Sequence, residues 1–188
     1  MEANFGGPAL CGLFGRKGNT TNPSPHQTSP HKAGPPTHVR RAPAHHPVVE
    51  AGNQSVIVFV TVCTEQKRPI LASEAAHQLV ISAWLKAPAW NVGRYVIMPD
   101  HIHFFAAPNT LPPSGLPRWV SQWKAFVSRQ FSMPQGSKLW QKNFWDTQLR
   151  QSENHSMKWN YVRQNPVRAG LVSQPDQWPY QGELNTLV

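Results

Sequence analysis

The chain has few acidic residues and no long apolar run. Its 188 residues include 9 Asp and Glu against 18 Lys and Arg, which gives a formal net charge of +9 at pH 7. A protein this basic most often binds a polyanion, and nucleic acid is the commonest one. The longest apolar stretch, residues 56–63, is too short to cross a bilayer. The first residues also lack the basic start and apolar core of a signal peptide.

Cysteine is scarce as well. Cys11 and Cys63 are far apart in the sequence and form neither a metal-binding spacing nor a disulfide framework. This usage predicts a reducing compartment, the cytoplasm.

Residues 1–52 lack apolar periodicity but hold eight prolines. Such a segment cannot bury enough apolar area to offset its chain entropy, so we expect a disordered basic tail. Its five histidines are irregularly spaced and interrupted by prolines, which favours a solvated tail over a metal-binding tract.

Regular structure is expected from about residue 53. Residues 56–63 are apolar on both faces, which indicates a strand covered on both sides. Ser73 suits the N-terminus of a helix. The pattern predicts strands at 56–63, 91–98 and 101–107, helices at 73–88, 116–131 and 152–166, and short strands or an irregular hairpin at 138–150. This order predicts an α+β fold, a mainly antiparallel sheet with helices packed on it.

Two histidines stand out in the apolar run of residues 94–108. In a strand, residues i and i+2 point the same way, so His101 and His103 should project side by side. Two neutral imidazoles on one face supply half of a metal site. An isolated pair of this kind is more often two surface histidines, so the argument depends on partners elsewhere in the chain.

The last predicted helix offers such partners. Tyr161 and Asn165 are four residues apart and should lie on one helix face. A tyrosine hydroxyl can act as a nucleophile that forms a covalent intermediate, and an amide oxygen can complete a metal's ligand shell. The alternative is a packing tyrosine and an Asn-Pro helix stop.

Three pieces of sequence, taken in order, resemble the IS200-like single-tyrosine transposases, and among them the REP-associated branch. They are Met-Pro-Asp-His-Ile-His at 98–103, Phe-Trp-Asp at 144–146, and Tyr-x3-Asn-Pro-Val-x-Ala-Gly-Leu at 161–171. The resemblance runs from about residue 56 to about residue 180. It implies a transposase domain at 53–182, followed by a short C-terminal tail at 183–188. The N-terminal tail at 1–52 is not required by the family.

The resemblance implies a ferredoxin-like sheet that carries a His-hydrophobic-His (HUH) nuclease. His101, His103 and Asn165 match the expected ligands of Mg²⁺ or Mn²⁺, and Tyr161 matches the nucleophile. The implied reaction is cleavage and strand transfer of single-stranded DNA at palindromic or hairpin repeats through a 5′-phosphotyrosine. The protein would act as a monomer or homodimer in the bacterial cytoplasm, in association with the nucleoid.

Basic residues are interleaved with tryptophans in the second half of the fold, a pattern that suits single strands and hairpin ends. The candidates for DNA contact are Arg163, Arg168, Lys158, Lys124 and Arg129. Two other interpretations remain open. One is a domesticated relative that binds palindromic DNA without cutting it. The other is a basic RNA-binding α+β protein.

Overall fold

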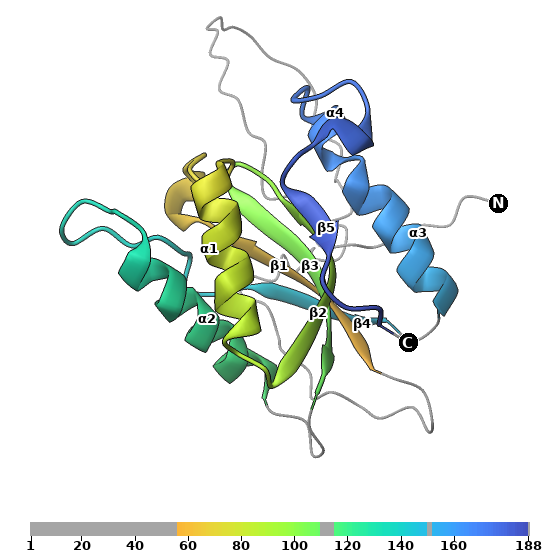
Figure 1. Ribbon diagram of the computed structural model, residues 1–188, viewed down its shortest axis with the longest axis horizontal. Helices are drawn as coiled ribbons and strands as arrows, with labels where there is room; N and C mark the ends of the chain where they lie inside the picture. Colours follow the sequence, from red (N-terminus) through yellow and green to blue (C-terminus); the bar gives the residue numbers. More distant parts are fainter. Residues whose placement is uncertain (1–55, 110–114, 150–151, 188) are drawn as a thin grey trace, which may run out of the picture. The chain divides into compact units, whose positions relative to one another are not determined.

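The computed structural model describes residues 56–109, 115–149 and 152–187 (Figure 1). The expected tail at 1–52 lies outside these residues. In the described parts of the chain, no helix has the length and apolar character needed to span a membrane.

Five strands form one sheet in the order β4-β1-β3-β2-β5, and every neighbouring pair is antiparallel. The strands are β1 (Ile57–Cys63), β2 (Trp90–Ile97), β3 (His101–Pro108), β4 (Trp145–Leu149) and β5 (Gln181–Glu183). Because β3 pairs with both β1 and β2, the unit from β1 through α1 (Glu74–Leu85) to β2 is a split βαβ unit, as in ferredoxin-like folds. The predicted α+β, mainly antiparallel fold is confirmed.

Local sequence explains where the first two helices begin and end. The Ser73 hydroxyl accepts a hydrogen bond from the amide of Ala76 and so caps α1. Helix α2 (Leu116–Gln130) has Pro117 in its first turn, where a missing backbone N–H costs nothing. Figure 1 shows α1 and α2 together on one side of the sheet and α3 (Ser152–Arg163) on the other.

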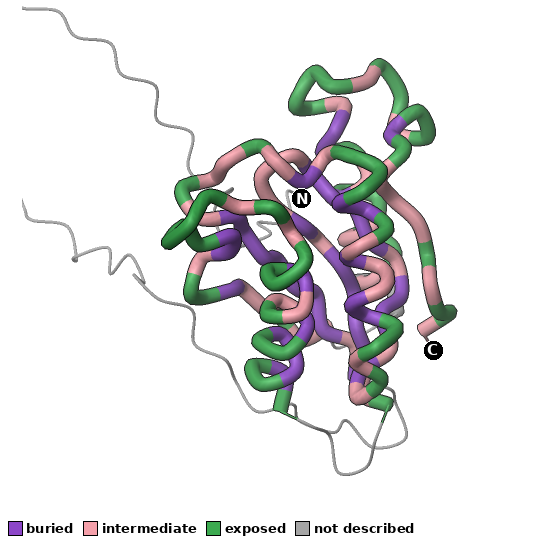
Figure 2. Tube along the Cα trace, turned by 60° about the vertical axis from the view of Figure 1, so that its left-hand side comes forward, coloured by how far each residue is buried: buried purple, intermediate pink, exposed green. Residues whose placement is uncertain are grey.

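The side under α1 and α2 holds the larger hydrophobic core. Trp84, Trp119 and Trp123 pack there against Phe104 and are at most 3 % exposed. Their rings meet edge-on or tilted, with centroids 5.2–6.3 Å apart, which is the range that aromatic pairs prefer. In Figure 2 the buried segments lie mainly along β1, β2 and β3 and on the inward sides of the helices.

A smaller cluster lies on the opposite side, under α3. Phe59, Phe105 and Val162 are buried there, and Trp159 packs partly buried against them. Alternation along β3 divides its side chains between the two sides. Ile102 and Phe104 belong to the larger core, whereas Phe105 belongs to the smaller cluster.

Three features of the fold refine the sequence expectation or differ from it. The first is the segment at 138–150, where the predicted short strand is confirmed and, among the described residues, the alternative of a hairpin is not. It contributes an isolated bridge at Trp140 and then β4, which pairs with β1. The partner strand lies more than eighty residues earlier, so no local turn signal could reveal this pairing.

The second difference is the end of the last helix. Helix α3 ends at Arg163, and a short helix, α4 (Asn165–Arg168), follows with Pro166 in its first turn. Proline lacks an N–H and clashes with the preceding helical turn, so a new helix begins around it. Tyr161 and Asn165 therefore lie on two consecutive helices and not on one continuous helix.

The third difference is β5, a strand that the sequence did not indicate. It pairs with β2 through Arg94–Glu183, Tyr95–Gly182 and Val96–Gln181. Beyond it, the side-chain amide of Asn185 donates to the Val92 carbonyl at 2.8 Å. The predicted domain boundary at residue 182 falls inside β5, so residues 183–187 continue the domain.

Candidate functional site

His101 and His103 lie side by side at the start of β3 and face the side of the sheet that α3 covers. Their Nε2 atoms are 3.1 Å apart, and the two rings meet edge-on with centroids 4.6 Å apart. The ring of His103 also stacks on Phe59 of β1. The side-by-side projection that the strand period predicts is confirmed.

Each imidazole is held in place through its other nitrogen. The Nδ1 of His101 lies 2.6 Å from a carboxylate oxygen of Asp100, and the Nδ1 of His103 lies 2.8 Å from the hydroxyl of Thr61. Thr61 reaches His103 because the two residues are directly paired across β1 and β3. Both rings are thus oriented so that their Nε2 atoms converge.

The hydrogen bonds allow two proton arrangements. An N–H on His101 Nδ1 donates to Asp100 and leaves a lone pair on Nε2. The hydroxyl of Thr61 can either donate to His103 Nδ1 or accept from it. If it donates, His103 carries its proton on Nε2 and donates to His101. If it accepts, both Nε2 lone pairs are free to bind a cation.

The charge of Asp100 supports this arrangement. Burial raises its pKa, but the hydrogen bond to His101 and the charges of His101 and Lys67 outweigh burial and hold the pKa below its usual value. An ionised carboxylate next to Nδ1 fixes the tautomer of a histidine and increases the basicity of its Nε2.

The pKa of His103 is well below its usual value. Burial is the main cause, and the positive charges of His101, Lys158 and Arg168 add to it. His103 is therefore a neutral ring at neutral pH, the form that binds a metal.

Lys158 connects the imidazole pair to the tyrosine. Its Nζ lies 4.7 Å from the ring centroid of Phe59, on which His103 stacks, and 5.8 Å from that of Tyr161. Burial lowers the pKa of Lys158. The side chain thus spans the gap between β1 and the exposed ring of Tyr161, which is 48 % accessible.

Arg168 joins Tyr161 to Asn165. Its guanidinium carbon lies 4.1 Å from the Tyr161 ring centroid, and the same group donates hydrogen bonds to the Tyr161 carbonyl and to the Asn165 side-chain oxygen. Asn165 is buried, with 7 % of its surface exposed. The structure therefore gathers both predicted helix residues around one cation.

The other predicted DNA contacts lie elsewhere. Arg163 pairs with Asp176 at 2.6 Å. The ammonium of Lys124 donates to the carbonyls of Gln141 and Lys142, and burial lowers its pKa to about 8. Arg129 is exposed at the end of α2, on the other side of the sheet. For all three residues, DNA contact stays a prediction.

The donor set suits a divalent cation only in part. Two nitrogen ligands at right angles, each about 2.1 Å from one ion, lie about 3.0 Å apart, close to the separation of the two Nε2 atoms. Within the described residues, no group of three or more His, Cys, Asp or Glu side chains could hold a metal. A third protein ligand would therefore be of another type, and the Asn165 oxygen, which Arg168 contacts, stays the predicted one.

Sequence reasoning did not assign roles to two residues of this site. Asp100 was noted only as part of the Met-Pro-Asp-His-Ile-His motif, and Thr61 only as part of the strand predicted at 56–63. A carboxylate directly before the histidine pair was a signal that could have found Asp100. No local signal could have found Thr61, because cross-strand register brings it to His103.

Two known proteins resemble this chain over most of its length. A REP-associated tyrosine transposase of Escherichia coli (strain K12) is 29% identical over 126 residues, which are 65% of this chain and 73% of that protein. No family model matches the chain. The chain resembles the REP-associated tyrosine transposases. The resemblance that the three sequence motifs predicted is confirmed.

A solved structure shares the fold of this chain. The solved structure of a REP-associated tyrosine transposase bound to a REP hairpin covers 74% of this chain and 81% of its own, with a TM-score of 0.62 and 19% sequence identity. At that identity the likeness supports the fold alone. The fold nevertheless places His101, His103 and Tyr161 on the same side of a sheet of the expected type.

Proposed function

We propose that the protein is a transposase-type enzyme that cleaves and rejoins single-stranded DNA at hairpins, with Tyr161 as the nucleophile. One observation carries the proposal. The imidazole pair, Lys158, Arg168 and the exposed ring of Tyr161 lie in a chain of contacts on one side of the sheet. A structural tyrosine would not require two cations at its ring and a preorganised imidazole pair nearby.

In the proposed reaction, the phenol oxygen of Tyr161 attacks the phosphorus of a phosphodiester. The bond to the 3′ oxygen breaks, the phenol gives up its proton, and the leaving 3′ oxygen takes one up. The product is a 5′-phosphotyrosine. Because the linkage keeps the energy of the phosphodiester, a second 3′-hydroxyl can reverse the step and join strands without a nucleoside triphosphate.

The cations of the site act on the phosphate. Lys158 and Arg168 both lie at the Tyr161 ring, so a phosphate that approaches the phenol is flanked by two positive charges. Such charges stabilise the negative charge that develops on the phosphoryl oxygens in the transition state. Arg168 also fixes the turn between α3 and α4 through its bonds to Tyr161 and Asn165.

His101, His103 and, as the predicted third ligand, Asn165 would hold Mg²⁺ or Mn²⁺. The ion, when bound, would neutralise charge on a phosphate oxygen and orient the phosphorus for in-line attack. Asp100 and Thr61 orient the two imidazoles for this role. Because imidazole is a softer ligand than magnesium prefers, we expect Mn²⁺ to bind more tightly.

The substrate is proposed to be a DNA hairpin, and the place of action the bacterial nucleoid. The solved relative of this fold is bound to a REP hairpin. In this chain, the excess of basic residues supports a nucleic-acid partner.

The decisive experiment looks for a covalent adduct. Hairpin DNA with a single-stranded flank is incubated with the protein and Mn²⁺ and then run on a denaturing gel. We expect an adduct with the natural protein and none with Tyr161→Phe, although both should bind the hairpin equally well. Tyr180→Phe, in another of the three tyrosines, is the matched control and should keep the adduct.

Other outcomes would overturn the enzyme or the role of Tyr161. Binding without adduct in both the natural protein and Tyr161→Phe would identify a DNA-binding module that does not cut. Tighter binding to an RNA hairpin of the same sequence would identify an RNA-binding protein. An adduct that persists in Tyr161→Phe would assign the nucleophile to another residue.

A further inference from the structure

Arg168 is exposed, yet its guanidinium lies against two groups that the proposed reaction uses. It donates hydrogen bonds to the side-chain oxygen of Asn165 and to the carbonyl of Tyr161, and its guanidinium carbon lies 4.1 Å from the centroid of the Tyr161 ring. Asn165 itself is buried, with 7 % of its surface exposed. The oxygen that is the predicted third metal ligand is therefore already bound by a cation of the protein itself.

A guanidinium and a divalent cation compete for this oxygen. A carboxamide oxygen has two lone pairs, but a metal ion and a guanidinium on the same atom would be like charges in close proximity. The surroundings of a buried side chain screen such repulsion poorly. Asn165 can therefore bind a metal tightly only after Arg168 has left it.

The charge of Arg168 also acts on the imidazole pair. Burial lowers the pKa of His103 most, and the positive charges of His101, Lys158 and Arg168 lower it further. A positive charge that disfavours a proton on this ring also disfavours a divalent cation bound to it. Neutralisation of Arg168 therefore favours a metal at His103 as well as at Asn165.

A phosphate of DNA is the group that can draw Arg168 away from Asn165. The bonds of Arg168 to Asn165 and Tyr161 go to neutral oxygens, whereas a phosphate offers charged oxygens in the fork geometry that arginine prefers. Because the guanidinium lies at the Tyr161 ring, a phosphate that approaches the phenol meets it. Arg168 lies in the last turn of α4 and is exposed, so its side chain can turn without disturbing the core.

We propose that Arg168 is a positioning residue that couples metal binding to substrate binding. Without DNA, Arg168 holds the Asn165 oxygen and covers the Tyr161 ring, an arrangement that we call the Arg168 latch. The phosphate that Tyr161 attacks takes over the guanidinium and so releases the Asn165 oxygen for Mg²⁺ or Mn²⁺. The protein therefore binds the metal tightly only together with its substrate. This inference rests on the proposed function for its substrate and its metal.

The test measures Mn²⁺ affinity by electron paramagnetic resonance in the Tyr161→Phe background, which keeps the ring but forms no adduct. Without DNA, adding Arg168→Gln should tighten Mn²⁺ binding by about tenfold, a usual size for coupling between sites. If Arg168 were only a brace of the turn between α3 and α4, the same variant would bind Mn²⁺ more weakly.

Addition of DNA tests the release of the latch. Hairpin DNA with a single-stranded flank should tighten Mn²⁺ binding by about tenfold while Arg168 is present, and by much less in Arg168→Gln. The Mn²⁺ that the hairpin binds on its own is subtracted. Because such coupling is reciprocal, Mn²⁺ should tighten hairpin binding by the same factor, as measured by fluorescence anisotropy.

A double-mutant cycle with Asn165 separates the latch from a general effect of charge. Arg168→Gln should lose most of its effect on Mn²⁺ affinity in Asn165→Ala, whose fold is verified by circular dichroism. Arg168→Lys leaves the buried Asn165 untouched and gives a second measurement. Lysine keeps the charge but lacks the fork that reaches both oxygens, so Mn²⁺ affinity without DNA should fall between those of the arginine and glutamine forms.

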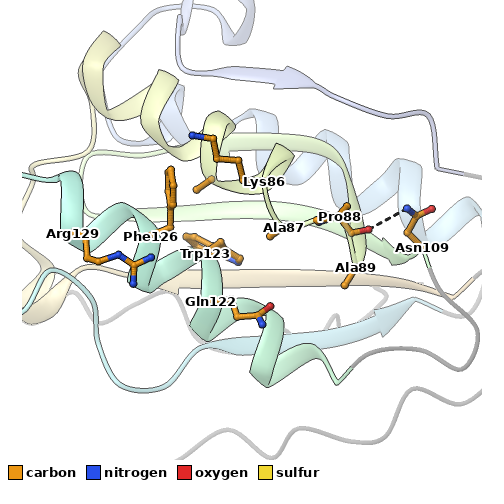
Figure 3. Close-up of a pocket in the computed structure, with 10 residues that line it drawn as sticks. Lys86, Ala87, Pro88, Ala89, Asn109, Gln122, Trp123, Phe126 and Arg129 are labelled. Atoms are coloured by element: carbon orange, nitrogen blue, oxygen red, sulfur yellow. Dashed lines mark hydrogen bonds between the residues drawn. The ribbon is translucent and has the colours of Figure 1, made fainter.

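A matched control lies on the other side of the sheet. Figure 3 shows a basic groove between α1 and α2, which Lys86 and Arg129 line and which has no acidic lining residue. Lys86→Gln removes one exposed positive charge there, as Arg168→Gln does at the site, and should leave Mn²⁺ affinity unchanged. Equal tightening in both variants would show that only the net charge of the protein matters.

Contrary results separate the latch from the proposed function. Unchanged or weaker Mn²⁺ binding in Arg168→Gln would overturn the latch, as would an equal gain with and without Asn165. Adduct formation by the natural protein is scored separately, so an adduct with no effect of Arg168 on Mn²⁺ affinity overturns the latch alone. An effect of Arg168 without an adduct overturns the nuclease alone. Absence of Mn²⁺ binding in every variant overturns the metal site and the latch together.

Discussion

The two sides of the sheet differ in what their side chains do. Under α1 and α2, three buried tryptophans and Phe104 pack in mutual ring contact. Under α3 and α4, the corresponding positions hold His101, His103 and the partly buried Lys158. The same strands supply both sides, because alternate residues of a strand face opposite ways.

This division shows how a small domain separates stability from chemistry. Polar groups are costly to bury unless each has a hydrogen-bond partner. On the side that carries the imidazole pair, Asp100 and Thr61 are the partners of the two rings. The rings under α1 and α2 contribute to the stability of the fold and lie away from the imidazole pair. The following predictions test this separation, from the largest expected effect to the smallest.

The first prediction compares a tryptophan from each side. Trp119→Ala, in α2, removes a fully buried ring and should lower the free energy of unfolding by about 3–5 kcal/mol. Trp159→Ala, in α3, removes a partly buried ring and should lower it by less than half as much. Urea unfolding followed by circular dichroism measures both. Equal losses would show that the two sides contribute alike to stability.

The second prediction concerns Thr61. Thr61→Val keeps the shape of the side chain but leaves Nδ1 of His103 without its partner, which should cost about 1–3 kcal/mol of stability. If the imidazoles bind Mn²⁺, loss of the orienting hydroxyl should also weaken binding by about 10–100-fold, as read by electron paramagnetic resonance. Thr147→Val, at an exposed position of β4, is the control and should change neither quantity.

The third prediction is a pH dependence that originates in the aromatic side. His77 is buried against the Tyr95 hydroxyl, and burial lowers its pKa although Glu74 partly raises it. Below about pH 6.5 the unfolded chain binds a proton that the folded chain resists, so stability falls as pH falls, by at most about 1.4 kcal/mol per unit.

Replacement of His77 measures how much this ring contributes to the pH dependence of stability. His77→Phe should flatten the decline of unfolding free energy between about pH 7 and about pH 5. The remaining slope comes from His103 and His155, whose pKa values burial also lowers. An unchanged slope in His77→Phe would contradict the buried, neutral state of this ring.

The smallest effect is expected at the exposed ion pair between Arg163, at the end of α3, and Asp176. Asp176→Asn removes the carboxylate that pairs with Arg163 in an exposed ion pair, which should change stability by less than about 1 kcal/mol. If Arg163 contacts phosphate, hairpin affinity should rise by a few fold, because the guanidinium is released. Weaker binding would remove Arg163 from the predicted DNA contacts. Fluorescence anisotropy at fixed salt measures the change.

Much of the fold was predictable because its signals are local. Ser73 marked the start of α1, and the apolar period of residues 116–131 marked α2. The pairing of β4 with β1 and of β5 with β2 was not predictable, since those contacts join segments about eighty-five residues apart with no connecting turn. Gly182 and its neighbours carry no strand pattern, and only the free edge of β2 makes them a strand.

The candidate site divides in the same way. Strand period alone placed His101 beside His103, and helical spacing indicated that Tyr161 and Asn165 are near each other. The break before Pro166 and the position of Arg168 between them came from the structure. Lys158 was predicted as a weak DNA contact, and its place between Phe59 and Tyr161 depends on how α3 packs on β1.

The amino-acid sequence by itself determined the order of the elements from β1 to α2, the side-by-side histidines and the excess of positive charge. The first two depend on residues close together in the chain, and the third is a sum over the composition. Only the tertiary structure decided that Thr61 holds His103, that Arg168 joins Tyr161 to Asn165, and that a basic groove lies across the sheet from both. These depend on strand register and helix packing, which are set when distant apolar faces are buried together.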